Sequence, residues 1–176
     1  MSTARRPLFR SIASKILAIQ LASSIAIAGI VGGVGYFGMS SMADSMTSLY
    51  DDRVVPLEQL KMVSDAYAIQ VVDTAYKLND GSLDWSDAAG NVDAAVLTID
   101  EQWTSFLGTL LTERETEIVD TVKAAMVDAD AAVADLKTIL RGRNATALDQ
   151  FIAQTMFPAI DPTTEALSEL TAYQLE

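Results

Sequence analysis

Arg53 is the residue whose type and position most directly suggest chemistry. It falls on a stripe that runs from Met46 to Leu78 in alternating steps of four and three residues, the spacing of a helix that faces other helices. A buried cation on such a stripe needs an anionic partner, because an unpaired buried charge is costly. A guanidinium can hold a ligand carboxylate through two parallel hydrogen bonds, so Arg53 is a candidate ligand-binding residue. An intramolecular salt bridge is the alternative, since acidic residues are plentiful.

Three aromatic residues also fall on helix-facing positions: Tyr50, Tyr67 and Trp103. They could line a pocket between helices for an aromatic acid. Most aromatic residues at such positions belong to the core, so packing is the alternative for each of them.

Other kinds of site find little support. The chain has no cysteine and no histidine, which excludes disulfides and thiolate zinc sites and removes the commonest general base. The acidic residues Asp128, Asp130 and Asp135 do not share one helix face and lack the ligand spacing of a calcium loop. We expect no metal, no cofactor and no catalysis, and hence a protein that is not an enzyme.

Charge is divided unevenly along the 176 residues. Residues 1–15 carry four cations and no anion, whereas residues 40–176 carry 8 cations and 24 anions, a net charge of −16. Nucleic-acid binding requires a cationic surface, so the acidic part should not bind DNA or RNA.

An apolar run without any charged side chain extends from Ile16 to Ala43, directly after Arg5, Arg6, Arg10 and Lys15. A run of this length spans the hydrocarbon core of a bilayer as a helix, and the preceding cations hold its start on the cytoplasmic side. A cleaved signal peptide is the alternative. We expect a cytoplasmic basic N-terminus over residues 1–15, a transmembrane helix over 16–39 and an exported domain over 40–176.

The exported domain is predicted to be all-α, with four helices. The first covers Ser40–Asn79, continues the membrane helix and is followed by a stop at Asp80 and Gly81. The second begins near Asp84, with an apolar seam from Val92 to Leu110.

The third predicted helix follows a capping box formed by Thr112 and Glu115 and ends at Gly142. The fourth follows a cap at Asn144, and Pro158 and Pro162 should distort its middle, with a possible restart at Asp161. Short connections favour an up-down-up-down bundle. The fourth helix, about 48 Å long, is shorter than the first, at about 60 Å. We therefore expect it to be truncated and the chain to be an N-terminal fragment.

Two segments carry a resemblance to a known family. They are Leu-Tyr-Asp-Asp-Arg-Val-Val-Pro-Leu-Glu-Gln-Leu at residues 49–60 and Phe-Pro-Ala-Ile-Asp-Pro at residues 157–162. In these the chain resembles the four-helix-bundle sensory module of methyl-accepting chemotaxis proteins. The resemblance implies a homodimer in the bacterial inner membrane whose periplasmic bundle senses small molecules. A second span, a HAMP linker and a cytoplasmic hairpin that acts on a histidine kinase through an adaptor normally follow.

The resemblance adds Thr155, with its neighbour Gln154, as candidate ligand-binding residues. In the related aspartate receptor, arginines of the first helix and a threonine of the fourth helix bind the ligand at the dimer interface. Arg53 and Thr155 are similar to those positions. The alternative for Thr155 is a helix hydroxyl bonded to a preceding carbonyl.

Together these features predict the sensory part of a transmembrane chemoreceptor. It should bind a small solute, such as an organic or amino acid carboxylate, between helices at a dimer interface. The same module also precedes histidine kinases and diguanylate cyclases, so another output is one alternative. A membrane-anchored oligomerisation domain that senses no ligand is the other.

Overall fold

The computed structural model describes residues 12–175, and within them the side chains of all but residues 13, 43–45, 47–49, 51 and 52. Contacts between residues divide the chain into two compact units, residues 1–48 and residues 49–176. Three of the cations that are expected to hold the N-terminus in the cytoplasm, Arg5, Arg6 and Arg10, lie outside the described residues.

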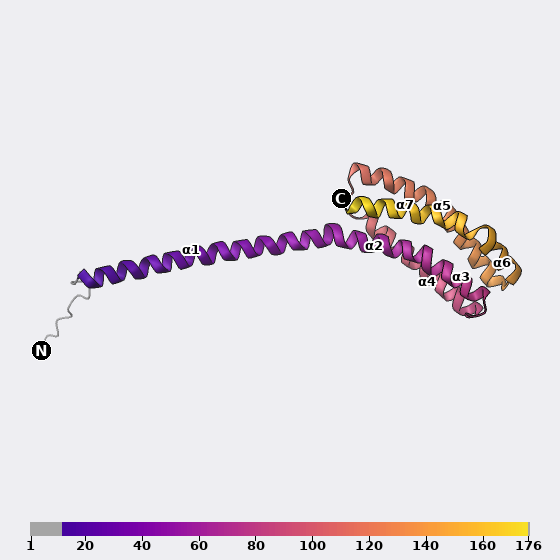
Figure 1. The fold of residues 1–176 in the computed structure, drawn as a ribbon, viewed down its shortest axis with the longest axis horizontal. Helices are drawn as coiled ribbons and strands as arrows, with labels where there is room; N and C mark the ends of the chain where they lie inside the picture. The colour runs from indigo at the N-terminus through magenta and orange to yellow at the C-terminus, as the bar shows by residue number, and fades with distance from the viewer. Residues whose placement is uncertain (1–11, 176) are drawn as a thin grey trace. The chain divides into compact units, whose positions relative to one another are not determined.

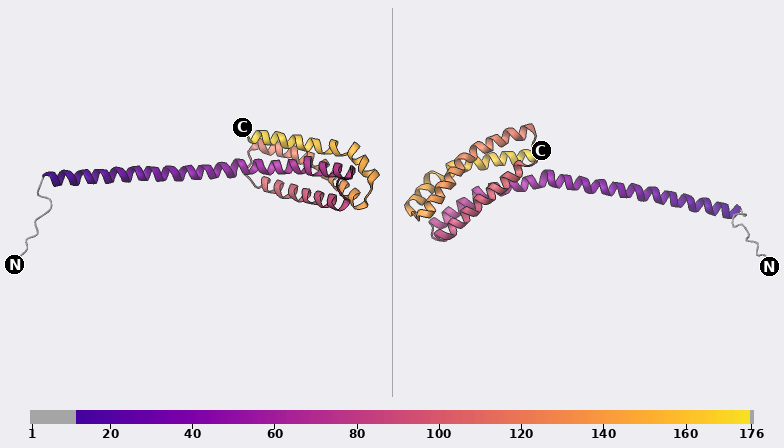
Figure 2. Two further views of the ribbon diagram at one scale, coloured as in Figure 1. Left: turned by 60° about the horizontal axis from the view of Figure 1, so that its bottom comes forward. Right: turned by 180° about the vertical axis from the view of Figure 1, so that it is seen from behind.

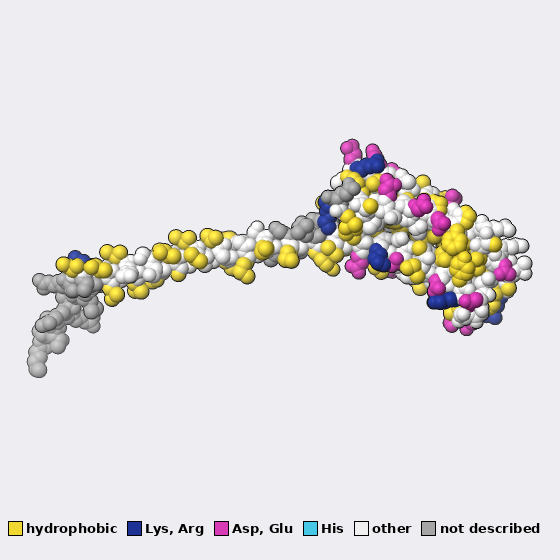
Figure 3. All heavy atoms as spheres, viewed as in Figure 1, with side chains coloured by type: hydrophobic (Ala, Val, Ile, Leu, Met, Phe, Trp, Pro, Cys, Tyr) yellow, Lys and Arg dark blue, Asp and Glu magenta, His cyan; other side chains and the backbone are white. Residues whose placement is uncertain are grey.

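Helix α1 (Ile12–Leu49) carries the apolar run. Its segment Ser14–Met42 is 29 residues long and apolar enough to cross a membrane, and none of it is buried by other parts of the protein. Hydrophobic side chains cover this helix on the face shown in Figure 3. A helix that is apolar on all sides must be covered by lipid or by protein.

The second unit is built only of helices among the described residues. The first helix of the bundle consists of π-helix η1 (Tyr50–Val54), α2 (Val55–Asp65), π-helix η2 (Ala66–Val71) and α3 (Val72–Asn79). Helices α4 (Trp85–Leu107) and α5 (Glu113–Gly142) follow, and then α6 (Ala145–Gln154) and α7 (Met156–Gln174) together form the fourth helix. Successive helices run in opposite directions (Figures 1 and 2), which confirms the predicted bundle.

The core lies between two packed pairs of helices, α2 with α4 and α5 with α7. The predicted seams supply much of it. The largest side chains that are completely buried come from all four helices of the bundle and include Tyr67, Phe106, Leu60, Leu136, Leu148, Met156, Ile160, Leu167 and Leu170.

The predicted helix ends are confirmed where a local cap determines them. Gly81, two residues after the end of α3, adopts φ 81°, a conformation that costs glycine little. The carboxylate of Asp84 accepts the backbone N–H groups at the start of α4, which lowers its pKa. Thr112 and Glu115 form the capping box of α5, and Asn144 caps α6.

The predicted seam of the second helix is wrong at Leu110. Helix α4 ends at Leu107, and Leu110 lies in the turn to α5, where it is 98% exposed. The chain leaves the helix at Gly108, whose N–H donates to two carbonyls of the last turn. A helical period therefore does not apply to the residues after it.

The break in the fourth helix occurs at Thr155, not at the predicted restart near Asp161. Pro158 then falls in the first turn of α7, where a missing N–H costs no helical hydrogen bond. Pro162 is accommodated inside α7.

The first helix buries its seam only in the second half. Positions from Leu60 to Leu78 face the core, whereas Tyr50 and Arg53 are exposed. The π-helical segment η1 contains both exposed positions, and its wider turn shifts which side chains face inward.

Candidate ligand-binding site

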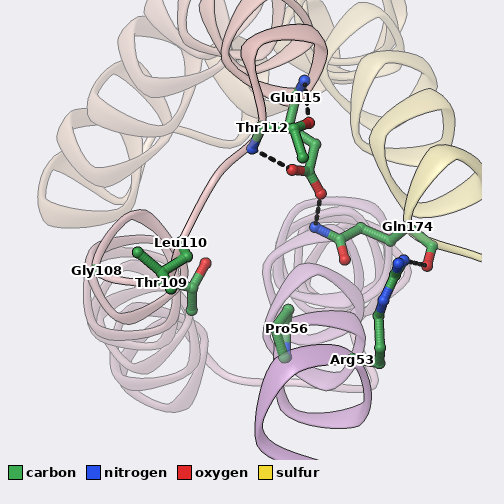
Figure 4. Close-up of a pocket in the computed structure, with 8 residues that line it drawn as sticks. All are labelled: Arg53, Pro56, Gly108, Thr109, Leu110, Thr112, Glu115 and Gln174. Carbon is green, nitrogen blue, oxygen red and sulfur yellow. Dashed lines mark hydrogen bonds between the residues drawn. The ribbon is translucent and has the colours of Figure 1, made fainter. Parts of the chain in front are cut away.

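A pocket of about 540 Å³ opens at the end of the bundle where the first helix begins and the last one ends. We call it the Arg53 pocket. Figure 4 shows the side chains around it, which come from the first helix, the turn between α4 and α5, the start of α5 and the end of α7. The lining residues are Arg53, Pro56, Gly108, Thr109, Leu110, Thr112, Glu115 and Gln174.

Arg53 reaches this pocket from η1. Its Nη1 donates to the main-chain oxygen of Gln174 at 2.8 Å, a contact between residues 121 positions apart in sequence. Arg53 forms no ion pair with any acidic side chain that the structure describes, a set that does not include Asp51 and Asp52. The salt bridge considered as the alternative for Arg53 is thus not formed with any of the described side chains.

Glu115 forms the opposite wall and is almost completely buried, with 6% of its surface exposed. Its Oε2 accepts the backbone N–H of Thr112 at 2.5 Å, and its Oε1 accepts the side-chain amide of Gln174 at 2.6 Å. Both donors are neutral. A buried carboxylate is stable only when its oxygens are satisfied, and two hydrogen bonds do so here.

The turn from Gly108 to Thr112 forms the outer rim of the pocket. The hydroxyl of Thr109 donates to the carbonyl of Phe106 at 2.7 Å and so fixes the start of the turn. Leu110 contributes an exposed apolar side chain, and Pro56 contributes another apolar surface from the first helix. The pocket thus combines one cation, one buried anion and apolar walls.

Comparison of the sequence with known proteins identifies the family of this chain. Residues 10–176 match the model of a family described as four helix bundle sensory module for signal transduction. The chain belongs to this family. The resemblance that the sequence motifs indicated is confirmed.

One curated relative of this sensory module is the methyl-accepting chemotaxis protein NahY of Pseudomonas putida. The two are 34% identical over 143 residues, which are 81% of this chain and 27% of NahY. The chain thus spans about a quarter of the length of this relative. A comparison with solved structures found no match.

The predicted residues Gln154 and Thr155 of the sensory module line a different pocket, of about 340 Å³. We call it the Thr155 pocket; its lining residues are Asp135, Thr138, Ile139, Ala147, Gln150, Phe151, Gln154 and Thr155. Glu115 and Asp135 are both on α5, 20 residues apart, which corresponds to about 30 Å. One subunit therefore does not bring Arg53 and Thr155 together.

Tyr67 lies in neither pocket. It is completely buried in η2, and its hydroxyl donates to Asp130 of α5. Burial, followed by the hydrogen bond to Asp130, raises the pKa of Tyr67 well above its usual value. Burial also raises the pKa of Asp130, and the nearby Asp100 adds to this, whereas the Tyr67 hydroxyl opposes it.

The other two aromatic candidates also lie apart from the pockets. Trp103 is a core residue whose ring stacks on Phe106 at a centroid distance of 5.5 Å. Tyr50 is 54% exposed at the start of η1. Within this subunit, Trp103 packs in the core, as the alternative interpretation of this residue proposed.

Glu115 and Gln174 were missed as site residues. The capping box that contains Glu115 could be recognised from the sequence, but it explains only one of the two carboxylate oxygens. No local signal marks Gln174, because its partners lie in distant parts of the chain. Among the described residues, no group of three or more His, Cys, Asp and Glu side chains could hold a metal ion.

Proposed function

We propose that this chain is the sensory part of a transmembrane chemoreceptor, which binds a small solute and transmits a shift of its helices across the membrane. The match to the sensory family over residues 10–176 is the observation that carries this proposal. The relationship to NahY, a methyl-accepting chemotaxis protein, supports chemotaxis as the output. In this proposal the chain acts by binding and not by catalysis.

The proposed location is the bacterial inner membrane, with the bundle in the periplasm. The apolar segment Ser14–Met42 supports a single N-terminal span. Four cations precede the uncharged run and would keep that end in the cytoplasm. The acidic surface of the bundle, visible in Figure 3, suits a domain that stands clear of anionic lipid headgroups.

We propose a homodimer that pairs through the first helix of the bundle. Met62, Ile69 and Tyr76 repeat at seven-residue intervals there, and they remain 37%, 56% and 43% exposed. Exposed apolar residues at heptad spacing are typical of a helix that packs against another helix. A second copy of the chain would cover this stripe.

The proposed ligand is a small solute with a carboxylate, bound between helices. Arg53 supports this choice, because its guanidinium lines a pocket and has no anionic partner among the described side chains. A solute can shift the packing of the helices only by as much as its affinities for two arrangements differ. Output would pass to a kinase and an adaptor through a cytoplasmic region that these 176 residues do not include.

A hybrid receptor tests the proposal. The region of NahY that aligns with this chain is replaced by the 143 aligned residues, and swimming of Pseudomonas putida cells is followed along gradients of organic acids and amino acids. We expect a response to at least one solute that cells without the hybrid ignore. Arg53→Ala in the hybrid should remove that response and leave its helical content unchanged.

A hybrid that reaches the membrane, dimerises and yet responds to no solute would contradict the proposal. Dimerisation without any response would favour an anchored oligomerisation domain instead.

A further inference from the structure

Another pocket, of about 270 Å³, lies between the first helix of the bundle and α4, which pack side by side (Figures 1 and 2). We call it the Thr74 pocket; its lining residues are Ile69, Gln70, Asp73, Thr74, Asn91 and Ala94. It shares no lining residue with the Arg53 pocket or the Thr155 pocket. Arg53 and Asp73 are 20 residues apart along the first helix, which corresponds to about 30 Å. The Thr74 pocket is therefore a separate site.

Thr74 supplies this pocket with a buried hydroxyl that has no partner among the described residues. Only 4% of Thr74 is exposed, and its side chain forms no hydrogen bond with any of them. Within the described chain, the unpaired side-chain oxygens that are sealed from solvent belong to Gln59 and Thr163. The Thr74 hydroxyl is not sealed in this way, so it stays accessible from the pocket that Thr74 lines. A buried polar group without a partner is costly, and a solute that bonds to it would satisfy it.

Two side-chain amides line the same pocket from its two walls. Gln70 belongs to the π-helical segment η2 of the first helix, and Asn91 belongs to α4. Both are exposed, and neither amide bonds to any residue that the structure describes. Each amide offers two N–H donors and a carbonyl acceptor. A π-helical turn within an α-helix is also frequent at functional sites.

The charges at the Thr74 pocket are balanced. Asp73 is its one charged lining residue, and its Oδ2 lies 2.6 Å from Nζ of Lys77. A carboxylate has about four lone-pair sites, so Asp73 can accept further hydrogen bonds beside this ion pair. An anionic solute would be repelled by Asp73 and by the acidic bundle, and a cationic one would compete with Lys77. A neutral solute meets neither conflict.

We propose that the Thr74 pocket binds a small neutral solute with several hydroxyl groups on one ring, of the class of monosaccharides. Each hydroxyl of such a solute is both a donor and an acceptor. This matches the mixed set that the Thr74 hydroxyl, the two amides and Asp73 present. Ile69 and Ala94 add a small apolar surface for the carbon skeleton of the ring. The volume of the pocket lies just below the range of about 300–1,000 Å³ for drug-sized ligands, which suits a single ring.

The position of the pocket would link such a solute to the pairing of subunits. Ile69 is both a wall of the pocket and a member of the exposed stripe that is proposed to pair in the dimer. Of the six lining residues only Ile69 belongs to that stripe, so the polar groups of the pocket lie on its flank. This site goes beyond the carboxylate ligand proposed for Arg53, and neither site depends on the other.

Titration calorimetry of the whole chain in phosphatidylcholine nanodiscs tests the proposal. The neutral probes are D-glucose, D-galactose and D-mannose. Each is compared with its uronate, which adds a negative charge to the same ring, and with its 2-amino sugar, which adds a positive charge. We expect at least one neutral sugar to bind about tenfold more tightly than both of its charged analogues.

Two variants assign the binding to this pocket. Thr74→Val keeps the shape of the side chain and removes only the hydroxyl, so it should weaken the neutral sugar about fivefold. Asn91→Ala changes an exposed residue, which leaves folding intact, and should weaken the sugar by a similar factor. Thr121→Val is the matched control, because this exposed threonine of α5 lies outside the pocket and its hydroxyl already donates to the Glu117 carbonyl. It should leave the affinity unchanged.

A third variant tests the selection against charge. Asp73→Asn keeps a similar shape and removes the negative charge, so it leaves Lys77 free to meet a carboxylate. The uronate should then bind more tightly relative to the neutral sugar than it does to the wild type. A merely structural role of Asp73 would not change this ratio.

The proposal is overturned if none of the neutral sugars binds, or if Thr74→Val and Asn91→Ala both behave like Thr121→Val. Weaker sugar binding in Arg53→Gln, with Thr74→Val unchanged, would move the sugar to the Arg53 pocket and overturn it as well. This failure differs from failure of the proposed function. A hybrid receptor that responds to a carboxylate, while no sugar binds, would leave the chemoreceptor standing and remove only the site at Thr74.

Discussion

The Arg53 pocket and the Thr155 pocket lie at two levels of one bundle and differ in what holds them together. Three stretches that are distant in sequence converge on the Arg53 pocket, and the hydrogen bonds of Gln174 to Arg53 and Glu115 cross-link them. The Thr155 pocket is lined only by α5, α6 and the break at Thr155, which follow one another along the chain. Its one charged lining residue is Asp135, which would repel a carboxylate.

The difference shows that Arg53 and Thr155, which were both predicted to bind the ligand, belong to separate pockets within one subunit. About 30 Å of α5 separates Glu115 from Asp135. Within a subunit, Arg53 instead donates to the main-chain oxygen of Gln174, whose side-chain amide donates to Glu115. Substitutions can therefore test each pocket independently, since sites this far apart usually contribute additively.

The largest effect on stability should come from Trp103, which lies in neither pocket. Trp103→Ala removes a buried ring stacked on Phe106 and should lower the free energy of unfolding by about 3–5 kcal/mol. Leu97→Ala on the same helix is the control, because Leu97 is 61% exposed and should cost less than about 0.5 kcal/mol. Urea unfolding measures both. Equal losses would mean that Trp103 is not a core residue.

The next largest effect should distinguish the two pockets, because Glu115 of the Arg53 pocket should contribute more to the free energy of unfolding than Gln154 of the Thr155 pocket. Glu115→Ala breaks the capping box and leaves the Gln174 amide without its acceptor, so we expect a loss of about 2–3 kcal/mol. Gln154→Ala alters an exposed residue of the Thr155 pocket and should cost about 0.5 kcal/mol or less. Urea unfolding of the two variants gives the comparison, and a greater loss for Gln154→Ala would reverse it.

Asp130 lines neither the Arg53 pocket nor the Thr155 pocket. Its effect on the free energy of unfolding should be smaller and should depend on pH. Burial and the nearby Asp100 raise the pKa of Asp130 in the folded state, so the folded protein binds this proton more tightly than the unfolded chain does. The contribution of Asp130 to stability is therefore greatest below the unfolded carboxyl pKa. It is lost as the pH rises through the raised folded pKa.

Comparing the wild type with Asp130→Asn isolates this contribution, because the other carboxylates titrate in both proteins. Thermal unfolding between about pH 6 and about pH 4 should show the wild type gaining stability relative to the variant as the pH falls. A difference that shrinks on acidification would show that Asp130 has a lowered pKa instead.

The smallest effect on stability should come from Arg53. Its side chain is exposed and donates a single hydrogen bond, so Arg53→Gln should change the free energy of unfolding by about 0.5 kcal/mol or less. A residue that matters little for stability but greatly for binding has a functional role. A loss as large as that of Glu115→Ala would instead assign Arg53 to the structure of the bundle.

Local signals in the sequence predicted the parts of this fold that depend on neighbouring residues. Asp84, Thr112 and Asn144 cap their helices as predicted, because each cap uses N–H groups within three residues. The seams were likewise predicted from their period. The prediction failed at Leu110, where a turn interrupts that period.

Contacts between distant residues could not be predicted in this way. The hydrogen bond from Arg53 to Gln174 joins the first and last helices and depends on how the helices are rotated. The π-helical segments change that rotation along the first helix, and no sequence rule marks where they occur. Arg53 was therefore identified as a candidate, whereas its partners in the pocket were not.

Hydrogen–deuterium exchange of the whole chain in nanodiscs tests the central claim most directly, because it locates the bound solute. The solute is the one that gives the strongest response with the hybrid receptor. We predict that it slows amide exchange in residues 108–117, around the Arg53 pocket, and leaves residues 147–157 unchanged. Slower exchange confined to residues 147–157 would place the solute in the Thr155 pocket and contradict the account.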